Sequence, residues 1–433
     1  MNSRTARSIF LLSILAIAAA AHAQQAQPKR VAIKAGRLVD VRTGNVATNV
    51  FIVVEGERIA SVGGSAPAGV EIIDLSNATV LPGLIDAHAH VLGNLKDQSP
   101  TSTLRMSSAQ SALWGVRNLQ VWLAKGFTAL REAGEADLSY GHIALRDSVR
   151  NGLIRGPRMV SAGSWISLTG GHGDADVLSP DQSLPRRPNL ADSVAEIGPA
   201  VRRDIKYGAD WIKLMATGGV GDPMSDYSVQ ELSEEQMAKA VELAHRAHKK
   251  VMAHAEGTEG IKAAVRAGVD SIEHGTMLDE EGATLMEQHG TWLVPTLNVF
   301  QREADVSAAI GYEAVSTAKI RAILKYQQPS FERALKHHVK VAFGVDDDPE
   351  FVDKEFGALV RGGMSPLDAV RAATINGAEL LGLTSEIGTI EPGKYADIIA
   401  VTGDPLRDIQ AMSQIVFVMK GGDVIRNDMA RSR

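Results

Sequence analysis

The chain has 433 residues, of which 45% are hydrophobic and 22% charged, so it can bury the core of one large domain and a smaller one. This composition excludes an intrinsically disordered or collagen-like chain. The formal net charge is −6, and no long run of Lys and Arg lies outside the termini, so the sequence predicts no nucleic-acid partner.

Residues 1–23 have the pattern of a cleaved secretory signal peptide. Arg4 and Arg7 precede the apolar run IFLLSILAIAAA, and AHA before Gln24 matches a signal peptidase site. The run is too short for a comfortable membrane span, and no second hydrophobic segment of about 20 residues follows. We therefore expect export across the inner membrane, a periplasmic location and no membrane contact after cleavage. The lack of cysteine excludes disulfides and thiol chemistry.

Both ends of the remaining chain predict short strands separated by Gly and Asn. Residues 30–80 contain VAIKAGRLVDV, NVFIVVEGERIASVG and VEIIDLS, and residues 388–433 contain YADIIAVTG and QIVFVMKGGDVIRN. We expect these two segments to form one small composite β domain, a β-sandwich.

The middle of the chain, residues 81–387, alternates short apolar strands with helical patterns. Eight candidate strands are LPGLIDAHAH, FTALREAG, RMVSAGSWI, DWIKLMATG, KVMAHAEG, VDSIEHG, TWLVPTL and VKVAFGVD. Ser233 with Gln236, and Ser365 before Pro366, are typical helix starts. Eight such units predict a (β/α)8 TIM barrel in the α/β class, whose chemistry lies at the carboxyl ends of the strands.

Candidate metal ligands follow four of these strands. His88 and His90 are two residues apart and therefore point to the same side of the first barrel strand. A pair of solvated loop histidines would have the same pattern. His254 after the fifth strand, His274 after the sixth and Asp346 after the eighth favour a metal centre, because all of these strand ends meet at one mouth.

Lys213 lies among apolar residues in the fourth strand, where a charged side chain is rare. Desolvation lowers the pKa of a buried lysine, and a neutral amine can take up CO2 to form a carbamate. The alternative is a buried ion pair between Lys213 and Asp346.

The order of these residues, with GTIEPGKYADIIAV near the C-terminus, resembles the metal-dependent amidohydrolase superfamily. The segments LTGGHGD, IKLMATGGV and AGVDSIEHGT resemble the branch of imidazolonepropionase-like enzymes and prolidase-like dipeptidases. This resemblance covers nearly the whole mature chain. It implies hydrolysis of an amide bond in a dipeptide or N-acyl amino acid, and some relatives cleave the phenylalanyl amide of ochratoxin.

The resemblance also implies a role for each ligand. His88, His90 and Asp346 would hold the more buried of two divalent ions, with zinc expected, and His254 with His274 the more exposed one. A CO2-derived carbamate on Lys213 would bridge the ions, and Asp346 would carry a proton to the leaving amine. By the same resemblance, His172 would bind the substrate carbonyl and stabilise the oxyanion, and Tyr227 would contact the substrate carboxylate. A loop-stabilising His172 and a half-buried structural Tyr227 are the alternatives.

The segment GVDDDPEF departs from the usual Gly-Thr-Asp of the relatives. Val345 replaces the threonine, and Asp347 and Asp348 add two carboxylates behind Asp346. These carboxylates would either raise the pKa of Asp346 or cap the following helix.

Other functions stay open. A hydrolase of a cyclic amide, such as an imidazolone, would use the same ligands, and a non-catalytic exported binding protein is the alternative from another class. A mononuclear deaminase is disfavoured because Gly257 stands where His-x-x-Glu would place its carboxylate. The sequence is compatible with a homo-oligomer.

Overall fold

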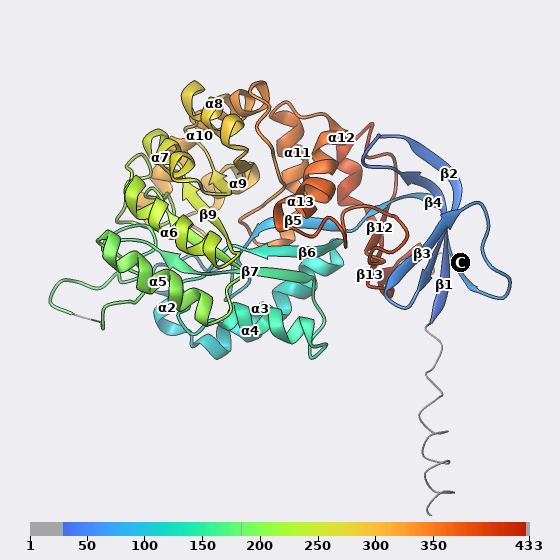
Figure 1. The fold of residues 1–433 in the computed structure, drawn as a ribbon, viewed down its shortest axis with the longest axis horizontal. Helices are drawn as coiled ribbons and strands as arrows, with labels where there is room; N and C mark the ends of the chain where they lie inside the picture. Colours follow the sequence, from blue (N-terminus) through green and yellow to red (C-terminus); the bar gives the residue numbers. More distant parts are fainter. Residues whose placement is uncertain (1–28, 183, 430–433) are drawn as a thin grey trace, which may run out of the picture.

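The computed structural model describes residues 29–182 and 184–429, which contain two separate seven-stranded sheets (Figure 1). The predicted signal peptide, residues 1–23, lies outside the described residues. Within the described part of the chain, no helix is both long and apolar enough to cross a membrane.

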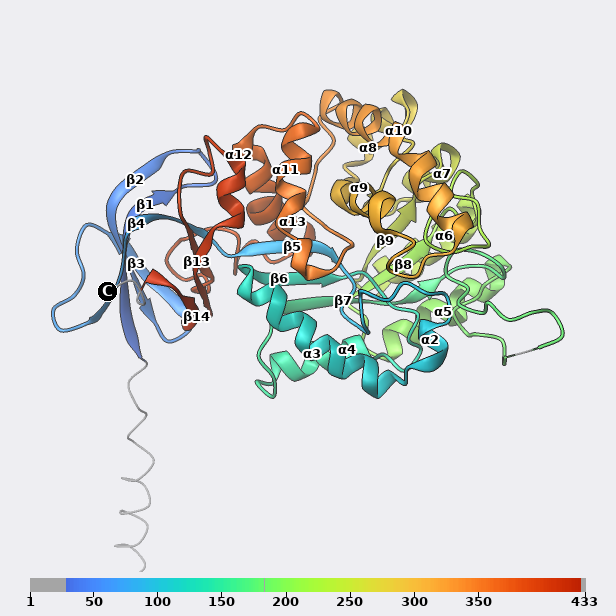
Figure 2. The same ribbon diagram turned by 180° about the vertical axis from the view of Figure 1, so that it is seen from behind.

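The larger sheet is parallel, and each of its strands is hydrogen-bonded to the next in chain order. It curves into an α/β barrel surrounded by helices, as both views show (Figures 1 and 2). Its strands are β5 (Leu84–Ala89), β6 (Phe127–Glu132), β7 (Arg158–Ile166), β8 (Trp211–Met215), β9 (Lys250–Ala255), β10 (Ser271–His274) and β11 (Trp292–Val294). Seven of the eight predicted barrel strands are therefore regular.

The eighth predicted strand is not a regular strand, but its backbone closes the barrel. Leu293 of β11 donates to the Lys340 carbonyl at 2.8 Å, and Ala87 of β5 donates to the Phe343 carbonyl at 2.8 Å. Gly344 lies so close to both neighbours that an added Cβ would be 2.3 Å from the Val294 side chain. The segment therefore follows the barrel wall without a continuous ladder.

The helices lie mostly on the outside of the barrel. The predicted starts are confirmed, because the side chain of Ser233 caps α6 and that of Ser365 caps α12. The helices are α2 (Ser102–Arg105), α3 (Ser108–Ala124), α4 (Gly141–Arg150), α5 (Val194–Lys206), α6 (Glu234–Arg246), α7 (Thr258–Ala267), α8 (Glu280–His289), α9 (Leu297–Val306), α10 (Ala314–Lys336), α11 (Lys354–Arg361), α12 (Pro366–Arg371) and α13 (Gly377–Leu381), with short helices η1 (Pro349–Phe351), η2 (Ala372–Asn376) and η3 (Ile409–Ser413).

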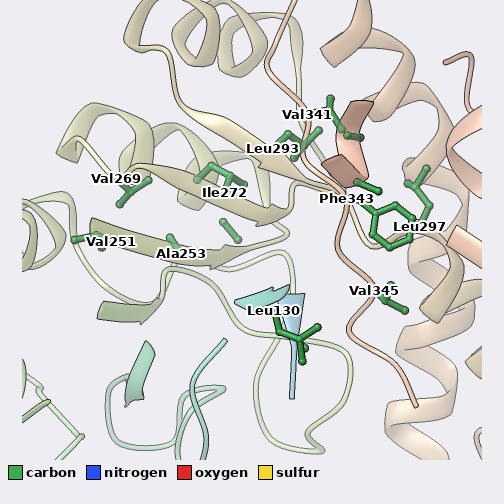
Figure 3. Close-up of a cluster of buried hydrophobic side chains, with 14 of the residues drawn as sticks. Leu130, Val251, Ala253, Val269, Ile272, Leu293, Leu297, Val341, Phe343 and Val345 are labelled. Atoms are coloured by element: carbon green, nitrogen blue, oxygen red, sulfur yellow. The ribbon is translucent and has the colours of Figure 1, made fainter. Parts of the chain in front are cut away.

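The main hydrophobic core joins the barrel strands to these helices. Figure 3 shows Ile272 and Leu293 beside Val341 of the closing segment, and Phe343 beside Leu297. Phe343 is fully buried, and its ring centroid lies 5.5 Å from that of Phe127 and 4.5 Å from that of Phe356. Side-chain packing thus holds the closing segment where regular strand pairing is missing.

The second sheet combines strands from both ends of the described chain in the order β14-β13-β12-β4-β1-β2-β3. These strands are β1 (Arg30–Val39), β2 (Val46–Glu55), β3 (Arg58–Gly63), β4 (Glu71–Pro82), β12 (Ile398–Val401), β13 (Ile415–Lys420) and β14 (Asp423–Asn427). They form one hydrogen-bonded sheet, so a sandwich of two sheets stays a prediction.

The second sheet is attached near the amino ends of the barrel strands. Arg158, the first residue of β7, forms a 3.1 Å ion pair with Asp397 and stacks on Tyr395 at 3.4 Å. The backbone of Gly83, just before β5, donates to the Asp397 carbonyl at 2.8 Å. The carboxyl ends of the strands, where a barrel places its chemistry, face away from this attachment.

Phe343→Ala tests the role of packing in barrel closure. We expect the free energy of unfolding, measured by urea denaturation, to fall by about 3–5 kcal/mol, because the deletion leaves a cavity between two rings. The control is Leu153→Ala, whose side chain is 78% exposed and should change stability by at most about 0.5 kcal/mol. Equal midpoints and slopes for the two variants would contradict this account.

Candidate active site

A cavity of about 520 Å³ opens at the carboxyl ends of the barrel strands. All six side chains that the sequence singles out as metal ligands line it: His88, His90, Lys213, His254, His274 and Asp346. Three of these groups, His88, His90 and Asp346, offer ligand atoms within 4.8 Å of one another. The barrel therefore brings distant parts of the sequence to one site.

The carboxylate of Asp346 lies at the centre of three imidazoles. Its oxygens are 3.2 Å from Nε2 of His90, 3.6 Å from Nε2 of His88 and 3.9 Å from Nε2 of His274. Burial alone would raise the pKa of Asp346, but His88 and His90 lower it well below its usual range. Asp346 is thus an ionised carboxylate at neutral pH.

The orientation of these imidazoles is set by hydrogen bonds at their other nitrogen. Nδ1 of His88 lies 2.7 Å from Glu273, Nδ1 of His90 lies 2.8 Å from the Gly134 carbonyl, and Nδ1 of His274 lies 2.7 Å from the Thr296 hydroxyl. Each Nε2 is therefore directed toward Asp346. Such partners are typical of metal-binding histidines, because they hold the ring and its tautomer in place.

His254 is oriented in the opposite sense. Its Nε2 is 3.1 Å from the Gly218 carbonyl, which leaves Nδ1 as the nitrogen for a ligand. Burial lowers the pKa of His254 and His88 well below the usual value and that of His274 to about 4. These rings are neutral, which is the form that binds a metal.

Lys213 of β8 is 2% exposed, and burial lowers its pKa to about 8 despite the carboxylates of Glu273 and Asp346. The ion-pair partners of Asp346 among the described residues are His88, His90 and His274. The structure therefore does not contain the Lys213–Asp346 ion pair that was the alternative. A buried amine, neutral imidazoles and a carboxylate form a donor set that fits divalent metal ions.

A buried ion pair that was not predicted from the sequence lies behind His88. Arg131 of β6 donates to both carboxylate oxygens of Glu273 at 2.9 Å, and both side chains are fully buried. Glu273 therefore joins Arg131 to Nδ1 of His88. A charged residue inside each of two apolar strands, in TALRE and SIEH, was the available signal.

Two further carboxyl groups near the site were not predicted. Glu132 and Glu135 each offer an oxygen within 4.8 Å of the other and of a ring nitrogen of His90. Burial raises the pKa of Glu135 to about 7 and that of Glu132 well above its usual value. Both follow the second barrel strand, where catalytic groups are expected, so their position was the signal.

His172 lines the cavity, and its ring centroid is 4.3 Å from that of His254. Its contact with a substrate carbonyl stays a prediction. Its Nδ1 is 2.7 Å from Asp222, a partner that the sequence analysis missed. Tyr227 does not line the cavity but packs against a cluster that includes Phe300. Its contact with a substrate carboxylate stays a prediction.

The unusual acidic segment after the closing strand has structural partners. Asp347 forms a 2.7 Å ion pair with Arg302, and Asp348 accepts a 3.0 Å hydrogen bond from the Glu350 amide at the start of η1. The pKa of Asp346 is lowered, not raised. Of the two alternatives, capping of the following helix is therefore the one observed.

The cavity wall away from the ligands is largely apolar. The segment that follows the seventh strand forms α9, and its Val299 and Phe300 line the cavity. The remaining apolar lining comes mainly from loops after β5, β6 and β7: Leu92, Leu95, Leu104, Met106, Leu138 and Val177. This wall can accept an apolar group several atoms across.

An α/β barrel with such a donor set at its strand ends has the arrangement of a metal-dependent barrel hydrolase. The model of the amidohydrolase family matches residues 79–425, and the chain belongs to this family. Ochratoxinase from Aspergillus niger is 32% identical over 427 residues, covering 92% of this chain and 87% of the relative. This relative and the prolidase structures described next confirm the predicted prolidase-like branch, and the chain is a hydrolase that acts on carbon–nitrogen bonds.

Solved structures agree with this assignment. A Xaa-Pro dipeptidase with methionine bound in its active site superposes with a TM-score of 0.85 at 33% identity, covering 91% of this chain and 99% of the other. A prolidase complexed with N-methylphosphonate-L-proline gives a TM-score of 0.84 at 32% identity, covering 92% of this chain and all of the other. The A. niger ochratoxinase structure gives 0.79 at 30% identity, covering 93% and 96%.

Glu273→Gln tests the buried ion pair. We expect the free energy of unfolding to fall by about 3–5 kcal/mol, because the Arg131 charge is left buried without its partner. The control is Glu350→Gln, which breaks an exposed pair with Arg117 and should cost at most about 1 kcal/mol. If Glu273→Gln lowers the free energy of unfolding in denaturant no more than this control does, the Arg131–Glu273 pair does not stabilise the site.

Proposed function

We propose that the protein is an exported binuclear-metal amidohydrolase that cleaves the amide bond of a dipeptide or N-acyl amino acid. A phenylalanyl amide such as that of ochratoxin A is one candidate substrate. The observation that carries the proposal is the convergence of four histidines, buried Lys213 and ionised Asp346 on one cavity. The similarity to ochratoxinase and to prolidases supports the choice of substrate.

Two divalent ions, with zinc expected, would share these ligands. His88, His90 and Asp346 would hold one ion, and His254 with His274 the other. The lowered pKa of Lys213 supports a carbamate at this position, because the neutral amine is the form that adds CO2. The carbamate would convert the amine into a carboxylate-like ligand, whose single negative charge is shared by two oxygens.

The bound ions supply a Lewis acid for the scissile carbonyl and a water of lowered pKa. Asp346 would accept the proton of the attacking water, because its lowered pKa keeps the carboxylate ionised. It then returns this proton to the amine, which leaves as a neutral group. Without this transfer the amine would depart as a poor anionic leaving group.

His172 would bind the substrate carbonyl oxygen. Burial raises the pKa of Asp222, but hydrogen bonds from His172 and Ser225 outweigh it and keep Asp222 ionised. The Asp222 carboxylate at Nδ1 would hold the ring so that Nε2 can face the oxygen on which negative charge develops. The apolar wall would receive the side chain or acyl group of the substrate.

The remaining expectations belong to the same proposal. Residues 1–23 would be removed on export to the periplasm, residues 30–80 with 388–433 would form the small β domain, and residues 81–387 the catalytic barrel. A homo-oligomer is compatible with this arrangement. Hydrolysis of a cyclic amide by the same donor set is the alternative function, and a non-catalytic binding protein is the alternative from another class.

Metal content and Lys213 provide one test. Purified enzyme should bind two divalent ions per chain by elemental analysis, and chelation should abolish amidase activity until zinc is restored. Lys213→Ala should lose at least about 100-fold in kcat/KM, because the bridging group is removed. The control is Lys206→Ala, on the exposed face of α5, with wild-type activity expected. A single bound ion together with full activity of Lys213→Ala would refute the binuclear centre.

A substrate panel separates the remaining functions. N-acyl amino acids and dipeptides with a free carboxylate, including a phenylalanyl amide, should be hydrolysed by the zinc-loaded enzyme, as measured by release of the free amino acid. Turnover of an imidazolone or another cyclic amide, with none of any dipeptide, would transfer the assignment to the alternative. No turnover of either class, combined with tight ligand binding, would favour the binding protein.

A further inference from the structure

The loop after β8, residues 218–226, is attached to α10 by a single lysine. The ammonium of Lys319 donates hydrogen bonds to the carbonyls of Gly219 and Ser225, each at 2.8 Å, and to that of Asp222. An ammonium has three N–H donors, so all of its donors are used within this loop. Lys319 lies about a hundred residues further along the chain, so this attachment exists only in the folded protein.

The same loop carries two groups that contact the imidazole ring of His172, whose backbone amide is held separately by Glu231. Oδ2 of Asp222 lies 2.7 Å from Nδ1 of His172 and accepts a 2.6 Å hydrogen bond from the Ser225 hydroxyl. Gly219 lies against the imidazole, because an added Cβ would be 2.3 to 2.6 Å from three of its ring atoms. The carbonyls that Lys319 binds therefore belong to the residues that place the ring and its partner.

Apolar contacts also join the 218–226 loop to α10. Val220 of the loop belongs to one buried cluster with Ile320 and Ile323, which follow Lys319 on α10, and with Val299 and Phe300 of α9. Lys319 is half-buried, and among the described residues it has no ion pair with a carboxylate. Its direct partners are carbonyl oxygens, which bind by direction and hold the loop in one conformation, while carboxylates such as Asp222 and Glu256 attract its charge from a longer distance.

We propose that Lys319 is a positioning residue for His172: by binding three carbonyls of the 218–226 loop, it holds Gly219 and Asp222 so that the imidazole presents Nε2 to the substrate. This inference rests on the proposed function for its effect on turnover. The geometry of the loop itself does not depend on which amide is cleaved.

The test is Lys319→Met, which keeps the length of the side chain and removes its donors. We expect kcat to fall about 10- to 100-fold with KM nearly unchanged and two metal ions still bound, because a small displacement of a group that contacts the reacting carbonyl slows the reaction strongly. The control is Lys325→Met, an exposed lysine on the same helix, with wild-type kcat expected.

A double-mutant cycle shows whether the effect passes through His172. In a His172→Ala background, Lys319→Met should lower kcat by less than about twofold, since the group that it positions is already absent. The same fold-loss in both backgrounds would overturn the proposal, as would an unchanged kcat in Lys319→Met.

A spectroscopic measurement separates this proposal from the choice of substrate. In enzyme with 15N-labelled histidine, the Nδ1–H resonance of His172, identified by its loss in His172→Ala, should shift or broaden in Lys319→Met and in Asp222→Asn but not in Lys325→Met. An unchanged resonance in Lys319→Met would overturn the proposal even if every predicted amide is cleaved. If no amide is cleaved, this measurement still decides the role of Lys319.

A second variant covers the case in which Lys319→Met fails to fold. Lys319→Gln, which removes the charge but keeps an N–H donor group, is expected to shift the same resonance.

Discussion

The site depends on a carboxylate, that of Asp346, which the barrel must hold among three imidazoles in the cavity. The carboxylate of Asp346 faces the imidazoles of His88, His90 and His274. Each of these rings is in turn fixed by a partner on another element. Because a buried charge without a partner is costly, every strand that supplies a ligand must keep its place. The metal-binding geometry and the stability of the barrel mouth therefore rest on the same contacts.

The charged groups of the site and the small sheet lie at opposite ends of the barrel. The sheet formed by both ends of the chain is attached near the amino ends of the barrel strands, through Arg158 and Asp397. The carboxyl ends remain lined by loops and by α9, which shape the cavity. Packing around Phe343 closes the barrel. Regular strand pairing does not continue there, because the segment after Phe343 bends to bring Asp346 to the histidines.

The regular elements and the candidate metal ligands were largely predictable from the sequence. Alternating apolar runs locate seven barrel strands, and ligand-type residues at the ends of those strands locate the site. The eighth strand was predicted as regular, but Gly344 and the left-handed backbone of Asp346 break its ladder. Asp347 and Asp348 could not be assigned from sequence, because their partners, Arg302 and the Glu350 amide, depend on how α9 and η1 pack.

The sequence by itself determined which residues have the chemistry of a hydrolytic metal centre, because ligand type and strand periodicity are local properties. Only the tertiary structure decided how these residues are held. The Arg131–Glu273 pair behind His88, the Asp222 partner of His172 and the attachment of its loop to Lys319 each join segments far apart in the chain. Such contacts depend on how whole elements are placed relative to one another, and local sequence patterns do not specify this placement.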